Sequence, residues 1–147
     1  MDMEIKKDED RNTDMRLSGY RILLAEDNEL NAEIARELLM DIGMEVAWAE
    51  DGRSCLKMFE KSPVGYYDAI LMDLRMPHMT GYEATQAIRT SKHAAAVSIP
   101  IIAMTADAFS EDIQKCLRCG MNAHIAKPID LQVLTRDVYK RQLTMRV

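Results

Sequence analysis

The sequence predicts an α/β fold with a parallel sheet, and two observations support this class. Short apolar runs of strand length alternate with segments in which apolar residues recur at helical spacing, and five such pairs fit between residues 20 and 140. Three of the apolar runs end directly at charged residues, namely Glu26-Asp27, Asp73 and Lys127. Because the carboxyl ends of parallel strands meet at one edge of a sheet, we expect these side chains to form one site.

The first strand is expected at residues 21–25, and a helix follows it. Asn28 is a plausible N-cap for this helix, and Gly43 is expected to end it. Between them, four apolar residues spaced four apart are expected to share one helix face. They are Leu30, Ile34, Leu38 and Ile42.

Four further strand and helix pairs follow in order. A strand at 45–49 leads through Asp51-Gly52 to a helix that carries Leu56 and Phe59, and a strand at 67–72 leads through a loop to a helix at 82–89. A strand at 100–105 precedes a helix that ends at Gly120 and carries Phe109, Ile113 and Leu117. The fifth strand reaches Lys127-Pro128. It precedes a last helix, which Asp130 is expected to cap and which carries Leu131, Leu134 and Val138.

Length and composition indicate one folded domain. Residues 1–18 mix acidic and basic side chains with almost no apolar ones, so their burial cannot offset the entropy of ordering, and a linker or disordered arm is expected. The folded domain is placed at residues 19–140 and a tail at 141–147.

The charge of the chain argues against several classes of partner. A formal charge of −5 and a pI near 5.2, with no basic block in the sequence, argue against binding of nucleic acid or an anionic membrane, which would need a basic face. No apolar run approaches the roughly 20 residues of a membrane span, and the polar first residues do not form a signal peptide. A cytoplasmic location without direct membrane contact is therefore expected.

The three cysteines do not predict a metal or redox site. Cys116 and Cys119 form a CxxC pair, but a structural zinc site usually takes four Cys or His ligands. The pair also precedes Gly120 at an expected helix C-terminus, where the helix dipole disfavours a thiolate. Reduced, half-buried thiols are the expectation for these two residues and for Cys55.

The acidic residues at the strand ends need a counter-charge. Two unit charges about 4 Å apart repel by roughly 4 kcal/mol at a near-surface effective dielectric, so the pocket needs a bound cation, a lysine, or both. Taken singly, Glu26-Asp27 and Asp73 could be solvated turn or cap residues, Lys127 a surface charge and Thr105 a helix cap. Capping gives no reason for all of them to lie on one sheet edge.

In this order along the chain, Glu26-Asp27, Asp73, Thr105-Ala106 and Lys127-Pro128 resemble the receiver domain of two-component response regulators, over residues 20 to 140. The resemblance implies a doubly wound, flavodoxin-like sheet of five parallel strands in the order 2-1-3-4-5. It also implies that Asp73 accepts a phosphoryl group from a phosphohistidine and that the domain then signals by conformational switching or relays the group onward. The domain itself would be a phosphoacceptor and not an enzyme.

The resemblance also implies roles for the other residues of the site. Mg²⁺ would be held by Asp27, Asp73 and the backbone carbonyl of Arg75, with Glu26 acting through water. Lys127 and the Thr105 hydroxyl would each contact a phosphoryl oxygen, and the small Ala106 would leave space for the phosphoryl group.

One position departs from the family pattern. An aromatic residue commonly lies three positions before the lysine and swings inward on phosphorylation, but this chain has His124 there. A switch made by Thr105 and His124 would therefore be weaker or sensitive to pH, although a partly buried spacer is the simpler interpretation of His124.

The amino-acid sequences of three segments resemble those of receivers fused to hybrid sensor histidine kinases. These segments are Met72–Pro77, Gly81–Thr85 and Ile102–Ala108. The expected partner is a histidine kinase or a histidine phosphotransfer domain, which would dock on the first helix around Asn28, Asn31 and Ala35. In a longer parent chain, the charged arm would tether the domain to a membrane sensor kinase. A monomer or weak homodimer is expected.

Three other functions fit the residues less well. A phosphatase that uses Asp73 as nucleophile would normally need a second acid two residues later to protonate the leaving group, but this position is Arg75. A flavodoxin-like FMN carrier would need a phosphate-binding first loop, but the acidic loop after the first strand repels phosphate. A receiver-like module that only binds proteins would not need the complete set of acidic, threonine and lysine residues.

Overall fold

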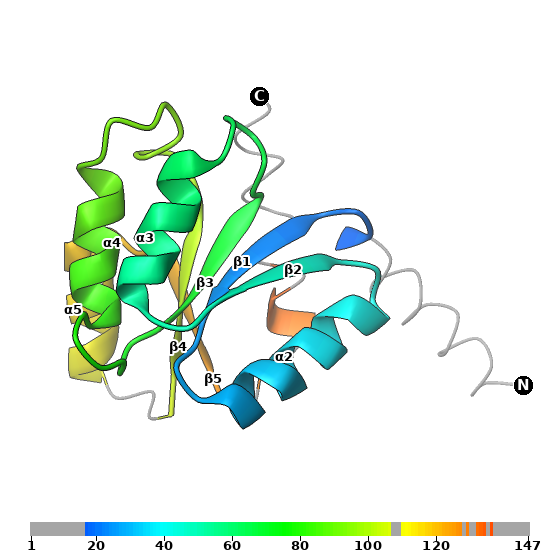
Figure 1. Ribbon diagram of the computed structural model, residues 1–147. Helices are drawn as coiled ribbons and strands as arrows, with labels where there is room; N and C mark the ends of the chain where they lie inside the picture. The colour runs from blue at the N-terminus through cyan, green and yellow to red at the C-terminus, as the bar shows by residue number, and fades with distance from the viewer. Residues whose placement is uncertain (1–16, 107–109, 128, 130–131, 135, 137–147) are drawn as a thin grey trace, which may run out of the picture.

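The computed structural model describes residues 17–106, 110–127, 129, 132–134 and 136. Its centre is a sheet of five parallel strands in the order β2-β1-β3-β4-β5 (Figure 1). The strands are β1 (Arg21–Ala25), β2 (Glu45–Ala49), β3 (Ala69–Asp73), β4 (Ile101–Thr105) and β5 (Ala123–Ala126). The expected class and strand order are confirmed, and β3 begins two residues later than the sequence suggested.

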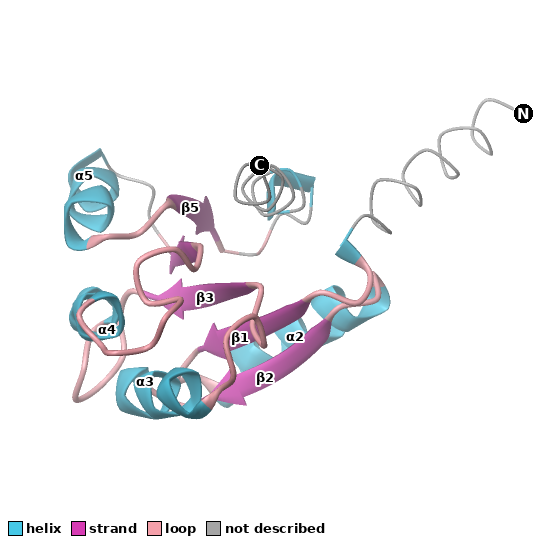
Figure 2. Ribbon diagram, turned by 90° about the horizontal axis from the view of Figure 1, so that it is seen from above, coloured by secondary structure: helices cyan, strands magenta, loops and turns pink. Residues whose placement is uncertain are grey.

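Helices cover both faces of the sheet, which gives three layers (Figure 2). The helices are α2 (Glu29–Asp41), α3 (Gly52–Lys61), α4 (Gly81–Arg89) and α5 (Ser110–Cys119). The buried residues of α3, α4 and α5 pack in one apolar cluster, and those of α2 pack with Leu134 in another. The sheet is buried between the two clusters, and this explains why β3 and β4 are apolar along almost their whole length.

The apolar face expected for the first helix is wrong in part. Leu30 and Ile34 of α2 are 64% and 46% exposed, whereas Ala32, Ala35 and Leu39 are buried. An α-helix has 3.6 residues per turn, so a stripe spaced four residues apart drifts around its surface, and the small alanines let the backbone approach the sheet. An apolar stripe is therefore left facing outward.

The same kind of difference occurs in α5. Leu117, one of the apolar residues that place this helix in the sequence, is 56% exposed, and the neighbouring Cys116 is buried. Phe109, which was expected in the same helix, lies outside the described residues.

The folded domain begins earlier than residue 19. Leu17 is fully buried in the cluster below α2, and Gly19 N–H donates to the carbonyl of Gly43 at 2.8 Å. Residues 1–16 of the arm expected at 1–18, the tail expected at 141–147, Pro128 and the expected cap Asp130 lie outside the described residues. Residues 132–134 and 136 are helical, as expected for the last helix.

Candidate functional site

Three carboxylates meet at the carboxyl edge of the sheet. Glu26 and Asp27 follow β1, Asp73 is the last residue of β3, and one oxygen from each lies within 4.8 Å of the others. Glu26 and Asp73 are only 2% and 5% exposed, whereas Asp27 is exposed. They line a cavity of about 280 Å³.

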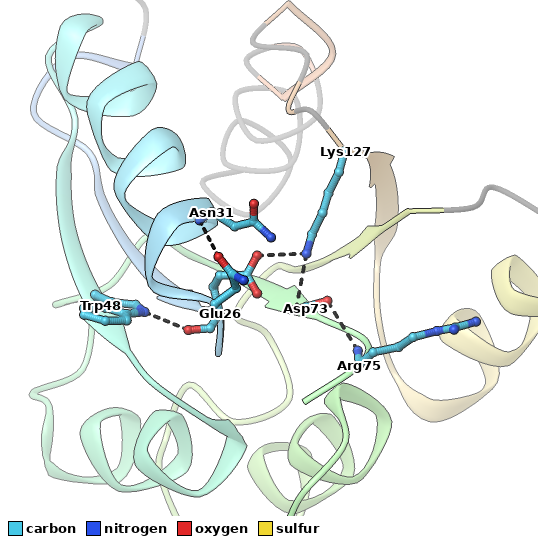
Figure 3. A network of polar contacts seen from close by, with 7 residues as sticks. Glu26, Asn31, Trp48, Asp73, Arg75 and Lys127 are labelled. Atoms are coloured by element: carbon cyan, nitrogen blue, oxygen red, sulfur yellow. Dashed lines mark hydrogen bonds and ion pairs between the residues drawn. The ribbon is translucent and has the colours of Figure 1, made fainter. Parts of the chain in front are cut away.

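Lys127, directly after β5, places its ammonium group between two of these carboxylates (Figure 3). Its Nζ lies 2.8 Å from Glu26 Oε1 and 3.3 Å from Asp73 Oδ2. The lysine expected from the sequence is thus in the position where it balances part of the negative charge.

Backbone hydrogen bonds fix the loops around the cavity. Lys127 N–H donates to the carbonyl of Thr105 at 2.9 Å, and Leu74 N–H donates to that of Met104 at 3.3 Å. Arg75 N–H donates to Asp73 Oδ1 at 3.3 Å, while the Arg75 side chain is exposed. These bonds tie the ends of β3, β4 and β5 together.

Gly81 brings the start of α4 against the backbone of Asp73. A Cβ atom at this position would collide with the carbonyl oxygen of Asp73 and would lie 2.9 Å from the Cα of Leu74. Just before it, the Thr80 hydroxyl accepts from Glu83 N–H at 3.2 Å, and the Glu83 carboxylate accepts in return from Thr80 N–H, which forms a capping box. The loop that follows Asp73 therefore has a fixed end.

Burial and neighbouring charges act on the protonation of the site. Burial raises the pKa of Glu26 above its ordinary value, Asp73 raises it further, and Lys127 partly opposes this. Burial alone would lower the pKa of Lys127, but the hydrogen bond to Glu26 and the charge of Asp73 raise it overall. The lysine is therefore held in its charged form.

The second oxygen of Glu26 points to what the cavity can hold. Glu26 Oε2 is buried and has no hydrogen-bond partner among the described residues. A buried carboxylate oxygen without a donor is costly, so a cation or an ordered water at this point would stabilise it. Three carboxylates close together are oxygen ligands of the kind that Mg²⁺ and Ca²⁺ prefer, so the donor set fits a hard divalent cation.

The structure brings most of the expected site residues together. Thr105, which is buried, and Ala106, which is exposed, line the same cavity as the carboxylates. His124 is not among the lining residues. The next residue, Ile125, packs in the cluster on the α2 side, so His124 lies on the opposite face of β5.

Trp48 is a contact of the site that sequence reasoning missed. Its indole Nε1–H donates to the backbone carbonyl of Glu26 at 2.8 Å (Figure 3). The alternation of β2 places Trp48 on the same face as Val46, but no pattern in the sequence indicates that the indole reaches across to the loop after β1.

A second cavity of about 370 Å³ adjoins the first along α2. The two cavities share Glu26, Asn31, Met104 and Lys127 in their linings. The remaining lining residues are apolar: Ile34, Ala35, Leu38 and Ile129. Of the docking residues expected from the sequence, Asn28 and Asn31 are exposed, but Ala35 is almost completely buried. Leu30 and Ile34 are exposed on the same helix.

Comparisons with known proteins agree with this geometry. The family model of the response regulator receiver domain matches residues 22–139. Among curated proteins, the chain is 36% identical over 150 residues to probable histidine kinase 2 of Oryza sativa subsp. indica, which covers 95% of this chain and 14% of the kinase. It is 39% identical over 116 residues to hybrid signal transduction histidine kinase I of Dictyostelium discoideum, which covers 78% of this chain and 7% of the kinase.

A solved structure shows the same fold. It is the receiver domain of a sensor histidine kinase from Pseudomonas aeruginosa, with a magnesium ion coordinated in its active site cleft. The TM-score is 0.73 and the identity 38%, over 84% of this chain and 97% of that one. The chain spans only a small part of the length of the curated kinases that it matches. Among the residues that the structure describes, no helix is long and apolar enough to cross a membrane.

Proposed function

Because the chain belongs to the family of response regulator receiver domains, we propose that it accepts a phosphoryl group from a phosphohistidine on Asp73 and passes the signal on. The observation that carries this proposal is the meeting of Glu26, Asp27 and Asp73 with Lys127 at one sheet edge. A helix cap or a solvated turn does not require this arrangement.

In the proposed transfer, a carboxylate oxygen of Asp73 attacks the phosphorus atom of the phosphohistidine. The phosphorus–nitrogen bond breaks, the imidazole leaves, and an acyl phosphate forms on Asp73. Lys127 Nζ already lies 3.3 Å from Asp73 Oδ2, so it is placed to pair with a phosphoryl oxygen. The Thr105 hydroxyl would donate to another phosphoryl oxygen, and Ala106 would leave room for the group.

The donor set fits Mg²⁺, which the related receiver from Pseudomonas aeruginosa holds in its cleft. Asp27, Asp73 and the backbone carbonyl of Arg75 would bind the ion, with Glu26 acting through water, and the unpartnered Glu26 Oε2 is consistent with this. When bound, the ion supplies positive charge that lowers the repulsion between the carboxylates and the incoming phosphoryl oxygens.

The partner would be a histidine kinase or a histidine phosphotransfer domain, and the docking surface is the stripe formed by Leu30 and Ile34 on α2. Both side chains are exposed, and Ile34 also lines the cavity that reaches Glu26 and Lys127. A partner helix that covers the stripe would bring its histidine to the acidic cavity. The curated relatives are histidine kinases much longer than this chain, so a place within a hybrid kinase is part of the proposal.

Switching would involve Thr105 and the strand that carries His124. Thr105 lies at the end of β4, and the register pairs Ala103 with His124 and Thr105 with Ala126. A change at the Thr105 hydroxyl would therefore reach β5 and the helix α5 that contacts it. Cys116 of α5 packs in the cluster on the face opposite to Ile125, which is the face of His124.

The test is a mass measurement on the intact protein. Incubation with Mg²⁺ and phosphoramidate should add one phosphoryl group, and removal of the cation with EDTA should abolish the gain. A protein that stays unmodified with a small donor at saturating Mg²⁺ would favour the alternative of a receiver-like module that binds partners without phosphorylation.

A further inference from the structure

The backbone of Glu26 is held from both sides by the end of β2. Glu26 N–H donates to the carbonyl of Ala49 at 3.1 Å, and the Glu26 carbonyl accepts from the indole of Trp48 at 2.8 Å. Both contacts come from the last two residues of β2, which is an edge strand of the sheet.

The hydrogen bond from the indole lies directly after the last backbone hydrogen bond between β1 and β2. In a parallel ladder the next donor to Glu26 would be the backbone N–H two residues after Ala49. That residue is Asp51, whose side chain accepts from Ser54 N–H at 2.7 Å as the N-cap of α3, and the chain turns away from β1 there. A side-chain donor therefore fixes a carbonyl that the sheet no longer holds.

This carbonyl belongs to the peptide group that joins Glu26 to Asp27. Because the peptide group is planar, the placement of the Asp27 Cα–Cβ bond relative to that of Glu26 depends on only two soft dihedrals, ψ of Glu26 and φ of Asp27. One carboxylate of this pair is buried against Lys127 and the other is exposed at the mouth of the cavity. A hydrogen bond that fixes this peptide group therefore restrains both dihedrals between the two carboxylates.

We propose that Trp48 is a positioning residue for the acidic site: its indole N–H fixes the peptide between Glu26 and Asp27 so that both carboxylates are oriented for a divalent cation. The inference rests on the proposed function, because it concerns the same cation. Trp48 does not touch the reacting atoms, and its effect is exerted through Glu26 and Asp27.

The first arm of the test compares Mg²⁺ affinity in two variants by isothermal titration calorimetry. Trp48→Phe keeps an aromatic ring and removes the donor, and it should weaken Mg²⁺ binding about threefold to tenfold, as expected for one net hydrogen bond. Val46→Ala is the matched control, because Val46 packs in the same cluster from the same face of β2 and does not contact the Glu26 carbonyl. It should lower stability and leave Mg²⁺ affinity unchanged.

The second arm needs no variant and remains decisive if Trp48→Phe folds poorly. The chain has a single tryptophan, so its indole N–H gives one identifiable NMR resonance. That resonance should shift during a Mg²⁺ titration with the same midpoint as the amide resonances of the acidic loop. An unshifted indole, or equal Mg²⁺ affinity in the wild-type and Trp48→Phe proteins, would overturn this inference alone. A wild-type protein that binds no Mg²⁺ would overturn the proposed function and this inference with it.

Discussion

Lys127 and Glu26 are 101 residues apart in the chain, yet Nζ and Oε1 are 2.8 Å apart. Their strands, β5 and β1, are separated in the sheet by β3 and β4, so the ion pair spans the carboxyl edge. Lys127 is a quarter exposed and Glu26 is buried, so the pair is shielded in part from solvent. Lys127 and a divalent cation would balance the same negative charge, so the positive charge of the lysine should weaken binding of the cation.

Lys127→Met should consequently bind Mg²⁺ more tightly and react more slowly. Removing a positive charge next to the carboxylates lowers repulsion of the cation, and we expect affinity to rise by about tenfold at low salt. Phosphorylation by a small donor should slow at saturating Mg²⁺, because a phosphoryl oxygen loses its pairing partner. Calorimetry at pH 8 and the rate of mass gain measure the two effects. Lys57→Met, on the exposed side of α3, is the control, and weaker Mg²⁺ binding in Lys127→Met would contradict this account of the lysine.

The exposed stripe on α2 should govern transfer from a protein donor. Ile34→Glu places a charge on the docking surface, and transfer from a phosphohistidine domain should slow about tenfold or more because a desolvated charge opposes binding. The reaction with phosphoramidate should be unchanged. Met40→Glu is the matched control, because Met40 is 55% exposed on the same helix but more than a turn beyond the stripe. Equal loss with both donors would mean that the pocket has been damaged, and equal effects of the two variants would argue against this docking surface.

Arg89 should contribute strongly to stability through hydrogen bonds that its guanidinium donates to carbonyl oxygens. Its guanidinium donates to the carbonyls of Gly120, Ala96 and Ile99 at 2.7–3.0 Å, and to Asn122 Oδ1 at 2.8 Å. Arg89→Met would remove this donor from the three backbone carbonyls, while Asn122 Oδ1 would keep its bond from Ile101 N–H. We expect a loss of about 2–4 kcal/mol in the free energy of unfolding. Urea unfolding measures it, with the exposed Arg53→Met as control. A loss below about 0.5 kcal/mol, typical of an exposed site, would show that water replaces the guanidinium without cost.

Cys55 should make the stability fall at alkaline pH. The thiol is fully buried, and burial raises its pKa from 9.0 to about 12. The folded chain therefore keeps a proton that the unfolded chain loses, so the contribution is present below pH 9 and is lost as the pH rises towards 12. Between pH 8 and 10 the wild type should lose about 1.4 kcal/mol more than Cys55→Ala. Parallel stability curves for the two proteins would contradict a buried, protonated thiol.

The strand ends that form the acidic site were predictable from the sequence because three of the apolar runs stop at charged residues. This property is local, and the parallel topology then brings Glu26, Asp73 and Lys127 together. The packed face of α2 was not predictable from the positions of the large apolar residues. Alanines make the close contact with the sheet, and Leu30 and Ile34 remain outside.

Contacts between segments far apart in the sequence could not be predicted either. The bond from Trp48 to Glu26 and the four acceptors of Arg89 depend on how loops approach one another in space, and residue spacing carries no signal for this. Leu17 was assigned to the charged arm because its neighbours are polar, although its own side chain is fully buried. The sequence therefore indicates the chemistry of the site better than the contacts that support it.

The central claim is that Asp73 is the residue that accepts the phosphoryl group. The most direct measurement is intact-mass analysis of the wild type, Asp73→Asn and Asp41→Asn after incubation with Mg²⁺ and phosphoramidate, with peptide mapping of the modified protein. Asp41 lies at the end of α2, exposed and away from the cavity, and serves as the matched control. The account predicts one phosphoryl group on the wild type and on Asp41→Asn, mapped to Asp73, and none on Asp73→Asn. A normal gain in Asp73→Asn would contradict it.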